Sequence, residues 1–225
     1  MGFLSNSLTF AGIFLQIALL TLILRGPVKR YFPLFLYVLS YVGVTLAEEW
    51  VLWKWGADRE HYFDVYWGGE LFLDMQLFLL LITLTLRALE GSPLRDKVLR
   101  LMGAAAVAVL LIPFVLFESQ VYTTRWNDGA SQLLNFAAAA MNLALWGALL
   151  ISKRRDAQLL LVSAGLGVSL AGAAVTFGMR NFTVEETVGR TIADYLHRLL
   201  QIGSVVILCW AFWPRRKPAP VESPV

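Results

Sequence analysis

Residues Tyr62 to Leu86 read YFDVYWGGELFLDMQLFLLLITLTL. As a helix rising about 1.5 Å per residue, this run is long enough to cross the roughly 30 Å hydrocarbon core of a bilayer. It nevertheless contains three carboxylates, Asp64, Glu70 and Asp74. A charged group at the centre of a membrane costs at least about 2.5 to 3.5 kcal/mol, and it normally faces the interior of a helix bundle. The run therefore predicts a transmembrane helix with one polar face.

Six further runs of similar apolar character occur along the chain. Apolar residues make up 58% of the 225 residues and charged residues only 16%, a mixture typical of membrane proteins. Lipid offers no hydrogen bonds to the backbone, and the runs lack the alternating pattern of barrel strands. We therefore predict an all-α, polytopic membrane protein, a seven-transmembrane-helix bundle. The other runs are Leu8 to Leu24, Tyr31 to Val51, Val98 to Phe117, Ala130 to Ile151, Leu159 to Met179 and Thr191 to Trp213.

Basic residues are distributed unequally between the two sides of this predicted bundle. The loops and chain ends on one side carry 13 Lys and Arg residues, those on the other side carry 5, and Arg198 lies inside a run. Cytoplasmic loops retain the excess of positive charge, so the N-terminus is predicted outside and the C-terminus inside. We divide the chain into a transmembrane domain, residues 1–214, and a short cytoplasmic tail, residues 215–225. Membrane insertion explains the basic residues, so no nucleic-acid partner is predicted.

Polar residues concentrate in three of the predicted helices. Glu70 and Asp74 are four residues apart and therefore share one helix face. Similar spacings place two further sets on single faces. These sets are Asp194, Arg198 and Gln201 in the last run, and Gln132, Asn135 and Asn142 in the fifth.

Depth along the helices predicts which of these residues meet. Counted from the predicted outer ends, Glu70 lies about 12 Å deep and Arg198 about 10 Å, which predicts an ion pair between them. Asp74 and Asn142 both lie about 18 Å deep, which predicts that they are close together. The result is an outward-opening polar cavity, unless the polar residues only hold the helices together. The predicted ligand-binding residues are Glu70, Asp74, Asn142, Asp194, Arg198 and Gln201, and Glu48 and Glu49 lie near the cavity entrance.

Small residues line one side of the sixth run. Such a stripe lets two helices approach closely, and we expect it to pack within the bundle rather than form a dimer seam. The stripe consists of Ser163, Gly165, Ser169, Gly172, Ala173 and Thr176.

Several membrane chemistries lack their characteristic residues. The five lysines lie in loops or at run ends, which argues against a retinal Schiff base. Only His61 and His197 are present, too few for the three-histidine zinc sites of seven-helix hydrolases. Paired Glu70 and Asp74 leave acid–base chemistry open, but no nucleophile accompanies them. No catalytic residue, metal or cofactor is predicted, and enzymatic activity is not the favoured interpretation.

Three short motifs carry a family resemblance. They are YFDVYWGGE at residues 62–70, RYFP at residues 30–33, and Arg87 at the end of the third run. With these motifs the chain resembles a group of uncharacterised bacterial seven-helix proteins, similar in topology to the sensory seven-helix regions of some bacterial histidine kinases. The resemblance implies location in the bacterial inner membrane. It implies no reaction and no site residue.

We therefore predict a receptor-like or sensory membrane protein that binds a small molecule or ion in its polar cavity. Carboxylates outnumber cations there, so a cationic or proton-linked ligand is favoured. The expected partners are the lipid bilayer, this ligand, and a cytoplasmic or membrane protein that receives the signal. A small-solute or proton-coupled transporter is the first alternative, although the apolar stretch Leu77 to Leu81 argues against an open pore. A structural subunit of a membrane complex is the second.

Overall fold

The computed structural model describes residues 2–26, 28–56, 59–116, 124–151, 156–182 and 188–214. In these residues the chain forms seven α-helices and one 3₁₀ helix, which confirms the all-α class. The predicted tail, residues 215–225, lies outside them. The elements are α1 (Gly2–Arg25), η1 (Val28–Arg30), α2 (Phe32–Trp55), α3 (Arg59–Ala88), α4 (Arg95–Leu116), α5 (Thr124–Ile151), α6 (Ala157–Phe182) and α7 (Val188–Phe212).

Six of these helices are long and apolar enough to cross a membrane, namely α1, α2, α3, α5, α6 and α7. Large apolar side chains also cover the outside of the molecule. Phe10, Trp53 and Leu150 are 72%, 83% and 81% exposed. Exposed apolar surface on this scale is unfavourable in water and suits a lipid environment. The chain is therefore an integral membrane protein.

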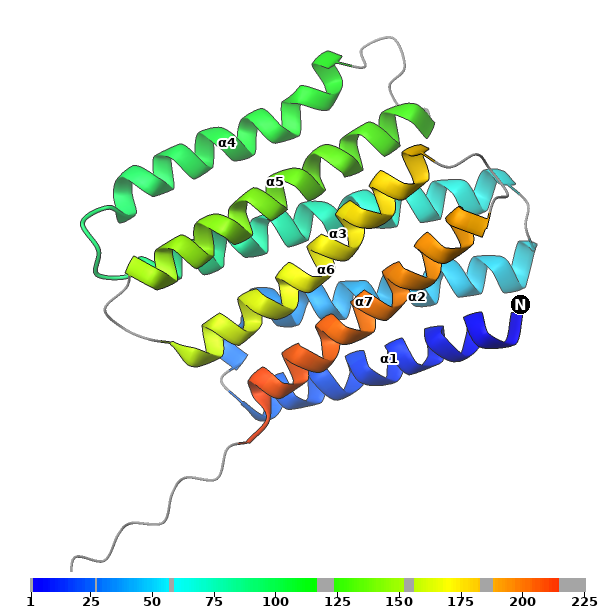
Figure 1. Ribbon diagram of the computed structural model, residues 1–225, viewed down its shortest axis with the longest axis horizontal. Coiled ribbons are helices and arrows are strands. Elements are labelled where there is room, and N and C mark those ends of the chain that lie inside the picture. Colours follow the sequence, from blue (N-terminus) through cyan, green and yellow to red (C-terminus); the bar gives the residue numbers. More distant parts are fainter. Residues whose placement is uncertain are drawn as a thin grey trace, which may run out of the picture.

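The six apolar helices form a closed ring, with α4 outside it (Figure 1). Around the ring, α1 contacts α2, α2 contacts α3, α3 contacts α5, α5 contacts α6, α6 contacts α7, and α7 returns to α1. Helix α4 packs at the edge, against α5 and α3.

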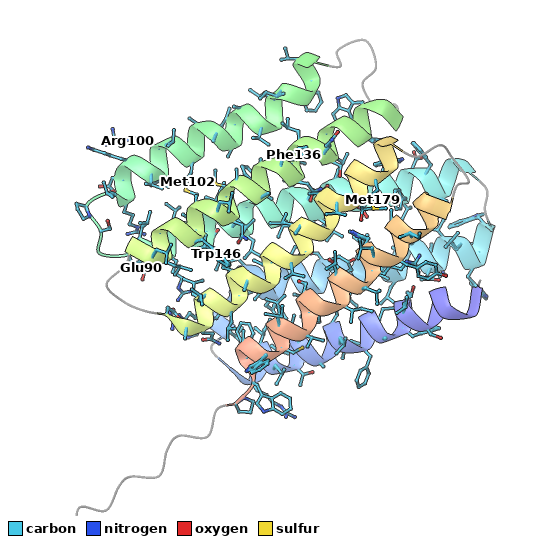
Figure 2. All side chains as sticks on the ribbon, viewed as in Figure 1. Glu90, Arg100, Met102, Phe136, Trp146 and Met179 are labelled. Carbon is cyan, nitrogen blue, oxygen red and sulfur yellow. The ribbon has the colours of Figure 1, made fainter. Side chains whose placement is uncertain are left out.

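The two ends of the ring differ in what fills the centre. We call them the Met179 end, where α3, α5 and α7 begin, and the Glu90 end, where α3 stops (Figure 2). Toward the Glu90 end the interior is a packed apolar core that includes the fully buried Phe78, Leu81 and Leu145. Toward the Met179 end, polar side chains surround empty space. The apolar core therefore forms the floor of a cavity.

Glycines allow the closest helix contacts in the ring. A Cβ atom added to Gly172 of α6 would lie 2.9 Å from the Cβ of Leu200 in α7, and one added to Gly165 would lie 2.9 Å from the Cγ of Leu208. Real Cβ atoms essentially never approach other atoms below 3.0 Å. The small residues of α6 thus face a neighbouring helix, which confirms their predicted role in packing within the bundle.

A polar cluster joins η1, α3 and the start of α6 at the Glu90 end. The Arg30 guanidinium forms an ion pair with Asp156, and Arg87 donates a hydrogen bond to the backbone carbonyl of Arg30. Asp156 also caps α6, because its Oδ1 accepts a hydrogen bond from the backbone N–H of Leu159 at 3.0 Å. The guanidinium carbons of Arg30 and Arg87 lie 5.7 and 5.3 Å from the centre of the Tyr31 ring.

Tyr31 itself is fully buried just before the membrane-spanning part of α2. Its ring meets Phe212 of α7 edge to face, with 5.0 Å between the ring centres. The Tyr31 hydroxyl has no hydrogen-bond partner among the described residues. Burial is the main cause that raises the pKa of Tyr31 to about 12, with a smaller contribution from the negative charge of Asp156.

Candidate functional site

Two adjoining cavities occupy the interior toward the Met179 end. The central cavity, about 390 Å³, lies among α2, α3, α5, α6 and α7. The side cavity, about 290 Å³, lies among α1, α2, α3 and α7. Volumes of this order suit small-molecule sites. The two cavities meet, because six residues line both of them: Tyr41, Tyr62, Glu70, His197, Arg198 and Gln201.

Helix α3 contributes a continuous row of side chains to the central cavity. Tyr62, Tyr66, Glu70 and Asp74 follow one another at intervals of four residues and all line it. This spacing keeps side chains on one face of a helix. The rings of Tyr62 and Tyr66 are stacked, with 5.9 Å between their centres. The aromatic part of this row was not predicted as part of the site, although it has the same four-residue spacing as the carboxylates.

Helix α2 adds two more tyrosines opposite this row. Tyr37 and Tyr41 are one helical turn apart, their ring centres are 6.4 Å apart, and both line the central cavity. Neither tyrosine was among the predicted binding residues, because each lies inside an otherwise apolar run. The central cavity thus has four tyrosines around its carboxylates.

Asp74 lies at the deep end of the α3 row and is only 8% exposed. Its Oδ2 accepts a hydrogen bond from the Ser131 hydroxyl of α5. Asn135, which also lines the central cavity, donates to the backbone carbonyl of Ser131 at 3.1 Å. Asn135 belongs to the predicted α5 stripe, whereas Ser131 was missed because serine in an apolar run usually bonds its own helix. Asp74 is therefore a buried carboxylate held at the cavity wall by α5.

Glu70 stands where the two cavities join. Its carboxylate interacts electrostatically with Glu48, which lines the side cavity, and with Asp74 in the central cavity. Arg198 lines both cavities beside it, so the structure brings the two members of the predicted ion pair to one region. The ion pair itself stays a prediction.

Gln201 connects α7 to α6 at the same level. Its Oε1 accepts a hydrogen bond from the Ser169 hydroxyl at 2.6 Å, and both residues line the central cavity. Of the six predicted binding residues, four therefore line this cavity: Glu70, Asp74, Arg198 and Gln201. Asp194 belongs to α7, but its side chain lies outside the described part of the structure.

The predicted proximity of Asp74 and Asn142 is wrong. Asn142 lines neither cavity; its Oδ1 accepts a hydrogen bond from the Ser163 hydroxyl of α6 at 3.0 Å. Its Nδ2 lies 2.7 Å from where a Cβ on Gly167 would be. Asp74 bonds Ser131, which is eleven residues before Asn142 and so about 16 Å away along α5. Equal depths counted from run ends failed because they do not determine the register between two helices, which here is set by the packing of α3 against α5.

Gln16 of α1 lines a cavity, although it was not among the predicted binding residues. It lines the side cavity and is only 5% exposed. Its Oε1 has no hydrogen-bond partner among the described residues. An unsatisfied buried acceptor of this kind costs about 1 to 3 kcal/mol. The sequence indicated this residue only by its being the one side-chain amide in the otherwise apolar run Leu8 to Leu24.

The charge of the lining is predominantly negative. Among the residues whose side chains the structure describes, four carboxylates line the two cavities and Arg198 is the one Lys or Arg. The carboxylates are Glu48, Glu49, Glu70 and Asp74. Carboxylate oxygens accept hydrogen bonds, and tyrosine faces attract cations through their ring quadrupole. The arrangement is chemically suited to hold a small cation.

No protein-family model, no curated protein and no solved structure matches this chain.

Proposed function

We propose that the chain crosses the bacterial inner membrane seven times, with the N-terminus outside and the C-terminus in the cytoplasm. Helix α4 is the seventh span in this proposal. Its 22 residues correspond to about 33 Å, enough to cross the hydrocarbon core. The excess of basic residues at the Glu90 end supports the orientation. The cavities then open toward the outside.

The function proposed for this bundle is receptor-like binding of a small cation in the central cavity. The observation that carries the proposal is the position of the Asp74 carboxylate. Asp74 is only 8% exposed and lies at the wall of a cavity of about 390 Å³ that four tyrosines also line. Its recorded side-chain donors, Ser131 and Asn135, are both neutral. Glu70 adds a second negative charge within electrostatic range. A bound cation would relieve the repulsion between these carboxylates and would gain cation–π attraction from the tyrosines.

A binding role is favoured over transport by the floor of the cavity. Leu77 lines its deep end, and the fully buried Phe78 and Leu81 follow on the same helix toward the Glu90 end. A transport path would have to cross this packed core. We propose that binding is instead signalled to a separate protein partner through the basic loops at the Glu90 end.

Thermal unfolding of the detergent-purified protein against a panel of cations tests this proposal. The panel includes sodium, guanidinium, tetramethylammonium and n-alkylammonium salts at matched ionic strength. A ligand at 100 times its Kd stabilises the folded state by about 2.7 kcal/mol. We expect at least one cation to raise the midpoint of wild type and not that of Asp74→Asn.

Asp64→Asn is the matched control for this experiment. Asp64 lies on the same helix, is exposed and lines neither cavity, so its variant should respond as wild type does. The proposal fails if no cation shifts the wild-type midpoint. It also fails if the shift survives in both Glu70→Gln and Asp74→Asn.

A further inference from the structure

The two cavities differ in the acceptors they offer. The central cavity contains Asp74 at its deep wall. The side cavity contains Glu48, Glu49 and the Oε1 of Gln16. Residues from α1 line the side cavity and not the central one, so a ligand confined to the central cavity would not reach Gln16. Each cavity therefore has its own place for a hydrogen-bond donor with a positive charge.

Gln16 restricts the kind of donor. Gln16 is only 5% exposed, and its Oε1 has no partner among the described residues, so this oxygen can accept a hydrogen bond from an N–H or O–H group of a ligand. A protonated primary amine supplies three such donors. A quaternary ammonium group supplies none, so it would leave this oxygen unpaired.

The region where the cavities join has a different electrostatic character. Arg198 and His197 line it together with Glu70, and the tyrosines Tyr41 and Tyr62 complete it. A ligand charge placed next to the Arg198 guanidinium would be repelled. An uncharged methylene chain against the tyrosine rings fits this region better. The favoured ligand thus has positive charges at its ends and an apolar middle.

We propose that the two cavities form one site for a linear aliphatic diamine, with one ammonium group on Asp74 and the other on Gln16 and Glu48. This inference rests on the proposed function, because it names the class of cation that the bundle binds. Charge complementarity at both ends and a satisfied Gln16 distinguish such a ligand from a simple monovalent cation. Polyamines with primary amino ends belong to the same chemical class.

Isothermal titration calorimetry of the full chain in detergent tests the inference. The ligands are α,ω-diamines of three to eight carbons, the n-alkylamine of each length, and the bis-trimethylammonium analogue of each diamine. A second charge-assisted contact is worth about 1.4 kcal/mol or more, which is a tenfold change in Kd. We expect at least one diamine to bind about tenfold more tightly than its monoamine and its permethylated analogue.

Variants of the side cavity locate the second ammonium group. Gln16→Leu and Glu48→Gln should each remove most of the diamine advantage, because they should weaken diamine binding far more than monoamine binding. Gln132→Leu is the matched control, because Gln132 is also an amide within a membrane helix but lines neither cavity. Having two variants of the side cavity keeps the test valid if one of them folds poorly.

The outcomes separate this inference from the proposed function. If monoamines bind with dependence on Asp74 but no diamine binds more tightly, the inference is overturned and the proposed function stands. The inference is also overturned if the permethylated analogues bind as tightly as the diamines, or if Gln16→Leu and Glu48→Gln keep the diamine advantage. If no amine and no other cation binds, both proposals are overturned.

Discussion

The contact between Gly69 of α3 and Val44 of α2 gives the sharpest test of how the cavity wall is built. A Cβ added to Gly69 would lie 2.5 Å from the Cγ1 of Val44, whereas ordinary contacts are 3.4 to 4 Å. Gly69→Ala must therefore push α2 and α3 apart, or rotate Val44, by about 1 Å. Overpacking of this kind costs about 1 to 3 kcal/mol.

The neighbouring Gly68 provides the reference for this change. A Cβ on Gly68 would have nothing within 4 Å, so Gly68→Ala should only gain the helix propensity of alanine, about 0.5 to 1 kcal/mol. Both variants share that gain, so the difference between them isolates the contact. At roughly 2 to 4 °C per kcal/mol, we expect Gly69→Ala to unfold about 2 to 12 °C below Gly68→Ala.

Thermal unfolding in one detergent is the assay, with the double variant Gly69→Ala/Val44→Ala as the rescue. Removing the Val44 methyl groups creates the space that the new Cβ needs, so the double variant should recover most of the loss after correction for Val44→Ala alone. If Gly69→Ala is as stable as Gly68→Ala, α2 and α3 do not approach at this point. The reasoning about the cavity wall would then be refuted.

Three further predictions concern stability. Ser131→Ala removes one of the recorded donors to the buried Asp74 carboxylate and should cost about 1 to 3 kcal/mol in thermal unfolding; an unchanged midpoint would contradict the contact. Tyr31→Phe removes a buried hydroxyl without a partner and should be neutral or stabilising by about 1 kcal/mol near pH 7. The pKa of Tyr31 rises from 10.0 to about 12 on folding, so the stability that the protonated hydroxyl contributes to the wild type is present below pH 10 and is lost as the pH rises toward 12. The stability of Tyr31→Phe relative to wild type should therefore grow by roughly 2 kcal/mol between pH 10 and pH 12. A constant difference would argue against burial of the hydroxyl. Asp156→Asn keeps the helix cap and loses only the half-exposed ion pair with Arg30, so it should lower the free energy of unfolding by at most about 1 kcal/mol. Asp156→Ala also loses the cap and should lower it by about 1 kcal/mol more. Equal losses in the two variants would show that the cap does not contribute to stability.

The chain's apolar runs and their polar faces were readable without coordinates. Glu70 and Asp74 were placed on one face of a helix by their spacing alone, and they do line one cavity. Gln201 and Arg198 were selected in the same way. These inferences succeeded because the periodicity of a helix is a local property of the backbone.

The predicted proximity of Asn142 to Asp74 was wrong for a reason that spacing cannot reveal. Its own helix face is set by its position in α5, but its partner is set by how α5 and α6 pack. Gly167 lets α6 approach closely enough for Ser163 to bond Asn142. Gln16 and Tyr37 were missed because each is a single polar or aromatic residue in an otherwise apolar run, so no spacing pattern indicates that it faces a cavity.

What the amino-acid sequence settles about this protein is its solvent, its helices and the polar face of each helix. Lipid requires every backbone amide of a span to bond within its own helix, so run length and composition are sufficient for that much. The ring of six helices with α4 outside it, and the joined cavities within the ring, depend on side chains from helices far apart in the chain. Those contacts are settled by close packing at residues such as Gly69 and Gly172, where the fit between two surfaces decides which faces meet.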